Sequence, residues 1–170
     1  EAIIESLKRT KTSPEPKVSS AKPSWYTIAE SKVGVKEFAG SADNPDIVEF
    51  HAATTLPASL QSQDETAWCS SFVNWCFLRA GLARTGSAMA RSWSKASKIM
   101  RKLSKPKLGA VVVLWRKSPN SSFGHVGFFV RETSSYIYML GGNQNDAVNI
   151  QRFPKSRLIG YYWPKSQALV

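Results

Sequence analysis

The stretch Asp64-Glu65-Thr66-Ala67-Trp68-Cys69-Ser70-Ser71-Phe72-Val73-Asn74-Trp75-Cys76-Phe77-Leu78-Arg79-Ala80-Gly81 decides the fold. Asp64 or Thr66 can act as an N-cap with Glu65 in the first turn, and a glycine such as Gly81 commonly follows the last turn of a helix. The residues in between are apolar almost all round, which is typical of a helix buried at the centre of a fold. We therefore predict a central helix over this stretch.

This helix carries two cysteines, for which we expect different roles. Cys69 lies within about the first turn, where the free N–H groups and the helix dipole can draw a thiol pKa below its usual value of roughly 8.5. Cys76 lies two turns further on, about 10 Å away along the axis. A disulfide needs Cα atoms within about 7 Å, so we expect none between them. A cysteine in an apolar helix is more often a small buried hydrophobe, which is the role expected of Cys76.

A nucleophilic cysteine needs a base, and the chain has two histidines. His51 is expected on a short surface helix that follows Asn44, with no partner that the sequence identifies. His125 opens a β-rich run, and the polar cluster 141–145 (Gly-Gly-Asn-Gln-Asn) follows the next such run. Separately, these would be a strand-end histidine and a turn. Together they predict a Cys-His-amide order of catalytic groups.

The 170 residues are most economically one domain, and 42% hydrophobic residues exclude a disordered chain. No apolar run approaches the roughly 18 residues of a membrane span, and no signal peptide is visible, so no membrane association is predicted. A chain that begins with Glu1 gives no cellular address. With two distant histidines and no Cys-x-x-Cys pattern, neither a zinc site nor any other metal or cofactor is expected.

Positive charge is concentrated in the middle of the chain. Residues 66–131 contain twelve lysines or arginines and no acid, within a net charge of +11. Such a segment could attract nucleic acid, an anionic membrane or an acidic polymer such as bacterial cell wall, or it could be a solvated basic face. Since no zinc, RNP or helix-turn-helix pattern accompanies it, a nucleic-acid partner is not predicted.

The order of the expected elements predicts an α+β domain. Residues 1–23 are expected to hold a short helix over 1–9 and then a proline-containing linker, and the globular domain to span 24–170. Ser24 can cap a helix that runs to residue 33, and a basic helical piece is expected up to about Lys102. Five β-rich runs then suit an antiparallel sheet on which the helix bearing Cys69 packs: 110–115, 125–130, 136–140, 147–152 and 158–163.

The motifs resemble a known family. Asp-Glu-Thr-Ala-Trp-Cys-Ser-Ser-Phe-Val-Asn-Trp-Cys, then Ala-Arg-Ser-Trp, Gly-His-Val-Gly-Phe and Leu-Gly-Gly-Asn-Gln-Asn, are similar to CHAP and NlpC/P60 cysteine peptidases of the papain-like group. The similarity spans roughly residues 25–164. More narrowly, the chain is similar to a subgroup found in phage endolysins and antibacterial (type VI-like) effectors. It implies a papain-like α+β fold, with Cys69 as nucleophile, His125 as base and Asn143 or Gln144 orienting the imidazole.

The sequence departs from the family at two places. Relatives often carry Gly-Asp where this chain has Gly109-Ala110, and CHAP relatives commonly have a glutamate near the third catalytic position, where this chain has only amides. Neighbouring residues of a strand face opposite ways, so only one amide can reach His125. Asn143 is the first choice and Gln144 the close second.

The resemblance implies that the substrate is peptidoglycan, cut within the stem peptide or between L-alanine and the lactyl group. Trp68, Arg91 and Trp93 are expected to line the groove, although Trp93 could belong to the core and Arg91 could be a surface cation. The expected protein is a monomer acting at the cell wall or periplasm, with an immunity protein as partner if it is an effector. The alternatives are a papain-like deamidase or acyltransferase acting on proteins, and a basic binding module whose Cys69 is structural.

Overall fold

The computed structural model describes residues 21–61 and 67–169, and the central helix of this part of the chain is α4, Cys69–Arg79. All its residues from Cys69 to Phe77 are buried, as the apolar pattern predicts. The helix ends as expected, because Gly81 adopts a left-handed conformation with φ of 71°. Its N–H donates to the Leu78 carbonyl, while that of Leu82 donates to the Phe77 carbonyl, which together form a Schellman motif.

The start of α4 differs from the prediction. Trp68 occupies the N-cap position and its side chain makes no capping hydrogen bond. The predicted capping residues Asp64 and Thr66 precede that position, and they lie outside the described residues. Cys69 is therefore the first residue of the helix.

The two helices that precede the central one in the prediction are both present. In α2, Pro45–Ala52, the Asn44 side chain accepts a hydrogen bond from the Asp46 N–H at 2.9 Å, as a capping asparagine should. Helix α1, Ser24–Glu30, begins at the residue expected to cap it and ends early, before a turn that leads to Gly34. The Pro23 carbonyl accepts the first helical N–H groups instead. Short helices α3, Ala58–Gln61, and α5, Ser92–Lys95, flank α4 in the sequence.

A six-stranded antiparallel sheet follows, in the order β1-β6-β2-β3-β4-β5. Five strands correspond to the predicted runs and a 3₁₀ turn, Lys155–Arg157, precedes the last of them: β2 Val111–Trp115, β3 Gly124–Glu132, β4 Tyr136–Gly141, β5 Asn149–Pro154 and β6 Leu158–Pro164. In the register, Leu114 lies between His125 of β3 and Leu158 of β6. The α+β prediction is therefore confirmed.

Strand β1, Met100–Leu103, corrects the expected basic helix up to Lys102. It pairs with β6 alone, from Met100 opposite Pro164 to Leu103 opposite Tyr161. Only Met100 is fully buried, so the segment carries no strong apolar period of either kind. Its conformation depends on pairing with a strand far along the chain, which local sequence does not reveal.

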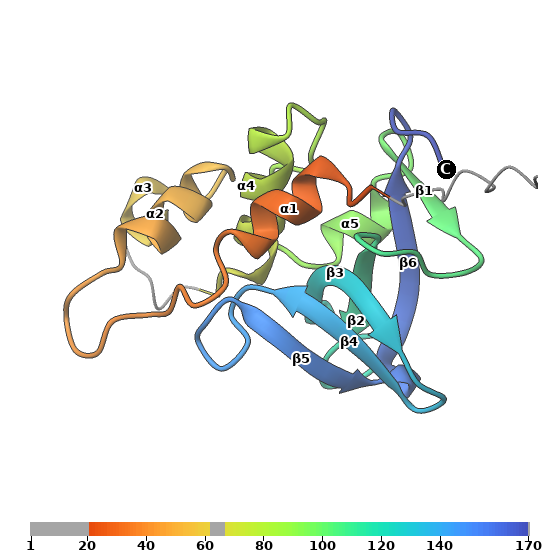
Figure 1. Ribbon diagram of the computed structural model, residues 1–170. Helices are drawn as coiled ribbons and strands as arrows, with labels where there is room; N and C mark the ends of the chain where they lie inside the picture. Colours follow the sequence, from red (N-terminus) through yellow and green to blue (C-terminus); the bar gives the residue numbers. More distant parts are fainter. Residues whose placement is uncertain (1–20, 62–66, 170) are drawn as a thin grey trace, which may run out of the picture.

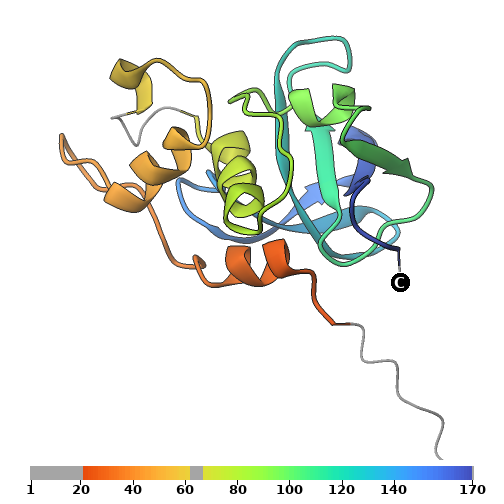
Figure 2. The ribbon, with the colours of Figure 1, turned by 90° about the horizontal axis from the view of Figure 1, so that it is seen from above.

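Helices α1, α2 and α4 lie together on one side of the curved sheet, as the two views in Figures 1 and 2 show. Their contact with the sheet is made largely by α4 against β3, where Phe72 and Phe77 meet Phe128. This packing brings the first turn of α4 toward β3. Most of the predicted extension 1–23, including the helix over 1–9, lies outside the described residues.

Candidate active site

Cys69 occupies the first position of α4 and is nearly buried, with 7% of its surface exposed. Burial raises the pKa of its thiol, because a thiolate loses its hydration there. The backbone N–H groups of Val126, Ser70 and Cys69 itself, together with the charge of Arg116, act in the opposite direction without reversing the shift. The expectation of a lowered thiol pKa is therefore wrong, since desolvation outweighs the helix start. The thiol is neutral at pH 7.

His125 is the second residue of β3, at the strand start where the sequence placed it. Its ring is buried, with Nε2 3.0 Å from Oε1 of Gln144 and the ring centroid 4.9 Å from that of Phe153. Burial lowers the pKa of His125 to about 4. The hydrogen bond that the ring donates to Gln144 acts in the opposite direction, and the charge of Arg116 lowers the pKa further. The imidazole is consequently neutral at pH 7 and able to accept a proton.

Gln144 determines which ring nitrogen of His125 carries the proton. The Gln144 amide nitrogen donates to the Met139 carbonyl at 3.2 Å, the Asn149 carbonyl at 2.9 Å and Oδ1 of Asn149 at 3.1 Å. These acceptors fix the amide so that its oxygen faces His125, and Nε2 of His125 must then be the donor. In the neutral ring the remaining nitrogen, Nδ1, is left with a lone pair. The site therefore holds the imidazole in one tautomer, with Nδ1 able to accept a proton.

The preference for Asn143 over Gln144 as the residue that holds the ring is wrong. Strand β4 ends at Gly141, so alternation along a strand does not apply to the residues that follow. Asn143 adopts a left-handed conformation with φ of 55° and makes no hydrogen bond with His125, whereas Gln144 turns inward and is 2% exposed. Both amides belong to a tight turn whose side-chain directions are set by local backbone dihedrals.

Gly142 anchors this turn to the core. A Cβ added there would lie 2.6 Å from the Trp68 ring and 2.8 Å from Cβ of Phe72, so only glycine permits this approach. A Cβ at Gly141 would likewise lie 2.5 Å from Oε1 of Gln144. The turn that carries Gln144 thus rests directly on the residues around the start of α4.

No hydrogen bond joins the Cys69 thiol directly to the His125 imidazole in this structure. The backbone N–H that approaches the Cys69 sulfur belongs to Val126, the residue after His125. Catalytic hydrogen bonds are often long in unliganded enzymes and tighten when substrate binds. The structure thus brings Cys69, His125 and Gln144 to one place, where α4, the start of β3 and the turn after β4 meet.

The two tryptophans expected in the groove belong to the core. Trp68 is 0% exposed, and its indole N–H donates to Glu37 Oε1 at 2.8 Å. Trp93 is also 0% exposed, and its indole N–H donates to Ser70 Oγ at 3.1 Å. Since neither ring reaches the surface, neither can contact a substrate, and the prediction of a binding role is corrected for both.

Arg91 is also not placed to bind a substrate carboxylate. Its guanidinium donates to the carbonyls of Phe123 at 2.9 Å, Pro119 at 2.9 Å and Ser118 at 3.2 Å. These three acceptors belong to the loop between β2 and β3. Arg91 therefore holds this loop in place, at the end of the sheet where His125 lies.

His51 lies in the core, which corrects the expected surface position and the missing partner. It is 0% exposed, with Nδ1 2.9 Å from the Ser71 hydroxyl of α4. Cys76 is also fully buried, and both cysteines are free thiols. Their separation along one helix agrees with the prediction that they form no disulfide.

A cleft of about 210 Å³ opens beside His125 and Gln144. Sequence reasoning missed most of its lining, notably Arg116 and Arg157, although each directly flanks a predicted strand. The remaining lining residues are aromatic, aliphatic or amide side chains: Leu114, Trp115, Asn143, Asn145, Gln151 and Phe153. Among its lining residues there is no aspartate or glutamate, so the cleft is positively charged.

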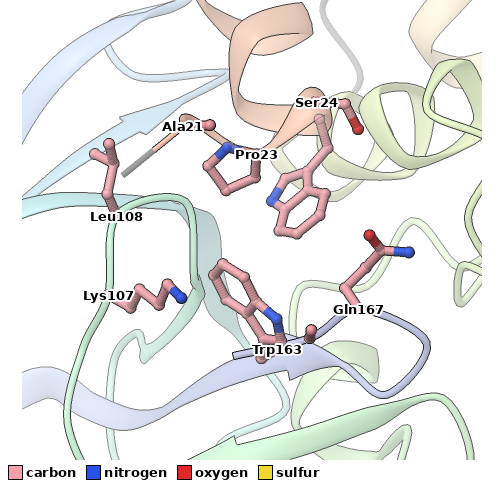
Figure 3. Close-up of a pocket in the computed structure, with 9 residues that line it drawn as sticks. Ala21, Pro23, Ser24, Lys107, Leu108, Trp163 and Gln167 are labelled. Atoms are coloured by element: carbon pink, nitrogen blue, oxygen red, sulfur yellow. The ribbon is translucent and has the colours of Figure 1, made fainter. Parts of the chain in front are cut away.

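A larger cavity of about 320 Å³ lies elsewhere, between α1 and the last strand. Figure 3 shows Pro23, Lys107, Trp163 and Gln167 around it. Trp163 is near the end of β6, whereas Arg157 immediately precedes its start. The two cavities are therefore at opposite ends of that strand. In the described part of the chain, no group of three or more His, Cys, Asp or Glu side chains could hold a metal ion, and no helix could span a membrane.

Comparison with known proteins relates part of the chain to one protein family. No curated protein matches the chain. A solved structure from Staphylococcus aureus, described as similar to lipoprotein, NLP/P60 family, has 17% identity and a TM-score of 0.44, covering 90% of this chain and 44% of that protein. This chain thus spans less than half of that protein's length. Residues 61–143, which include Cys69 and His125, match the model of the CHAP domain.

Proposed function

We propose that the protein is a peptidoglycan hydrolase that cuts an amide bond through Cys69, His125 and Gln144. One observation carries the proposal: Gln144 holds His125 in the tautomer that leaves Nδ1 as a base, beside the helix start that bears Cys69. This arrangement falls largely within the segment that matches the CHAP domain. Hydrolases of this type act on the cell wall, so we place the activity there.

The chemistry begins from two neutral groups. As the Cys69 sulfur attacks the amide carbonyl, Nδ1 of His125 takes the thiol proton, and Gln144 accepts a hydrogen bond from Nε2–H of the resulting imidazolium. The backbone N–H of Cys69, at the helix start, stabilises the oxyanion. His125 then gives the proton to the leaving amine, which forms a thioester. Water, deprotonated by His125, hydrolyses the thioester and restores the thiol.

Neutral starting groups mean that the reaction proceeds by general base catalysis. The raised thiol pKa and the lowered imidazole pKa both disfavour a resting thiolate-imidazolium pair. The charge separation therefore develops during attack, where Gln144 and the helix start can stabilise it. The cut bond is either within the stem peptide or between L-alanine and the lactyl group, because both are amides that this chemistry can attack.

Digestion of purified sacculi tests the proposal. Gram-negative and Gram-positive sacculi are incubated with the protein, and the released fragments are identified by mass spectrometry. New peptide amino termini indicate an endopeptidase, and free lactyl groups indicate an amidase. The Cys69→Ala variant should release nothing, while Cys76→Ala, which changes the other cysteine of the same helix, should remain active. No fragments from any wall type would refute the proposal and favour a protein substrate or a binding role.

The biological setting follows from the same activity. We propose that the protein acts as a monomer, as a phage lysin or an antibacterial effector, and that an effector would have an immunity protein as its partner. Coexpression with a neighbouring gene product that protects cells from lysis would identify an effector. If the protein digests wall material and no neighbouring gene product protects cells from it, a lysin is favoured.

A further inference from the structure

The cleft beside His125 carries two arginines whose charges are not neutralised by neighbouring acids. Arg116 and Arg157 both line it, and both are exposed. The ion pairs between described residues are Lys22 with Glu30, Lys32 with Asp46 and Lys155 with Glu132, so neither arginine is paired there. The only ring contact of Arg157 within that part of the chain is with Trp115, at 5.9 Å from the guanidinium carbon to the ring centroid.

Strand pairing explains why the two arginines line the same cleft. Leu114 of β2 pairs with Leu158 of β6 on one side and with His125 of β3 on the other. Arg116 immediately follows β2 and Arg157 immediately precedes β6, so antiparallel pairing places them at the same end of the sheet. β3 also begins at that end, and His125 is its second residue.

We infer that Arg116 and Arg157 bind a free carboxylate of the substrate in the cleft beside His125. This inference rests on the proposed function and names a chemical feature that the peptide must have. A guanidinium offers a planar fork of N–H donors that matches a carboxylate. Stem peptides provide such a group, because D-glutamate linked through its side chain keeps its α-carboxylate. In some walls this carboxylate is amidated, which would remove the charge that the cleft recognises.

Arg91 differs from these two arginines because its guanidinium donors are used within the protein. Its donors are directed to three loop carbonyls, whereas Arg116 and Arg157 make no side-chain hydrogen bond with the described residues. Their donors remain available to a ligand that enters the cleft. The polar residues Asn145 and Gln151 also line the cleft and can bind peptide amides.

The two arginines differ in how cleanly they can be tested. The charge of Arg116 also acts on Cys69 and His125, so its removal would alter the reacting groups as well as the cleft. Arg157 is not among the charges that shift the pKa of either group, so it is the better residue to replace. Arg152 is a matched control: it lies between Gln151 and Phe153, which line the cleft, and strand alternation directs it to the other face, where it stacks on Tyr136.

The test uses two synthetic stem peptides that differ only at D-glutamate, one with the α-carboxylate and one with the carboxamide. The wild-type protein should cut the carboxylate peptide with a kcat/KM about 5- to 20-fold higher, as expected for a charge-assisted contact in a solvated cleft. Arg157→Gln should lower kcat/KM for the carboxylate peptide about 5-fold, mainly through KM, and change the amidated peptide less than about 2-fold. Arg152→Gln should leave both values unchanged.

Equal cleavage of the two peptides by the wild-type protein, or equal losses on both in Arg157→Gln, would overturn the inference. Binding separates this failure from a failure of the proposed function. If the wild-type protein cuts neither peptide, titration calorimetry with Cys69→Ala still measures affinity for each. Tighter binding of the carboxylate peptide, lost when Arg157→Gln is added, supports the carboxylate site, and equal binding of both peptides refutes it.

Discussion

Replacement of Gln144 with alanine tests the candidate site most directly, because this side chain fixes the tautomer of His125. It removes four hydrogen bonds: one to the His125 ring, two to the carbonyls of Met139 and Asn149, and one to Oδ1 of Asn149. Each buried polar group left unpaired costs about 1–3 kcal/mol, and water entering the space offsets part of this. We expect the free energy of unfolding to fall by about 3 kcal/mol, which lowers Tm by about 10 °C in a domain of this size.

The catalytic effect of Gln144→Ala should exceed what partial unfolding explains. Without the amide oxygen, Nε2 of His125 loses its acceptor, and the ring can take the tautomer that protonates the nitrogen needed as base. Positioned acid-base groups contribute about 10²- to 10⁴-fold to rates, so we expect a drop of about 10²-fold in kcat/KM. Cys69→Ala should lose more, because it removes the nucleophile itself.

Asn143→Gly is the matched control, since it deletes the neighbouring amide and retains the positive φ of 55° without strain. Activity on a soluble stem peptide is measured for both variants at a temperature well below their Tm values, with folding checked by circular dichroism. Gln144→Ala should be crippled, and Asn143→Gly should retain most of its activity. A nearly inactive Asn143→Gly beside an active Gln144→Ala would refute the assignment of Gln144.

Four further predictions concern the cysteines, the histidines, the pH dependence and the basic segment. Cys69→Ala should abolish hydrolysis in a folded protein, and Cys76→Ala should remain active with a small loss of stability; equal inactivation of both folded variants would contradict this. His125→Ala should be inactive. His51→Ala should remain active but lose about 1–3 kcal/mol of unfolding free energy, because Ser71 loses its partner. An inactive but folded His51→Ala would mean that the base is misassigned. The pKa of His125 is lowered to about 4, below its unfolded value of about 6.5, so kcat/KM should fall only near pH 4. The unfolding free energy should decrease as the pH drops from about 6.5 to 4. A fall of kcat/KM near pH 6.5 would refute the buried neutral base. If the basic segment 66–131 attracts the protein to an anionic wall, raising salt from about 50 to 300 mM should slow digestion of sacculi much more than cleavage of a small peptide, because the Debye length shrinks from about 14 to 6 Å; parallel losses would place the effect inside the cleft.

Local signals made the positions of Cys69, His125 and Gly81 predictable. A helix end with a glycine and a histidine at the start of a β-rich run are visible in a few neighbouring residues. The capping role of Asn44 is of the same kind. Their positions agree with the structure because no distant contact overrides these signals, while the catalytic roles of Cys69 and His125 stay predictions.

The remaining parts of the site depend on contacts that sequence does not display. The choice between Asn143 and Gln144 was decided by a turn with positive φ angles, where strand alternation gives no guidance. Trp68 is a large aromatic residue whose environment decides between groove and core, and it packs against a glycine far along the chain. Arg116 and Arg157 come together only through the pairing of β2 with β6.

The position of β6 has a consequence for biosynthesis. This strand follows the other five in the chain, yet in the sheet it lies between β1 and β2. Until β6 has emerged from the ribosome, β1 has no partner and β2 exposes one edge, so the sheet that holds His125 cannot be complete. A nascent chain or a fragment ending before Leu158 should therefore lack hydrolytic activity and be prone to edge-to-edge aggregation. Under the proposed function, a cell that makes this protein is exposed to its hydrolytic activity only after β6 has been synthesised.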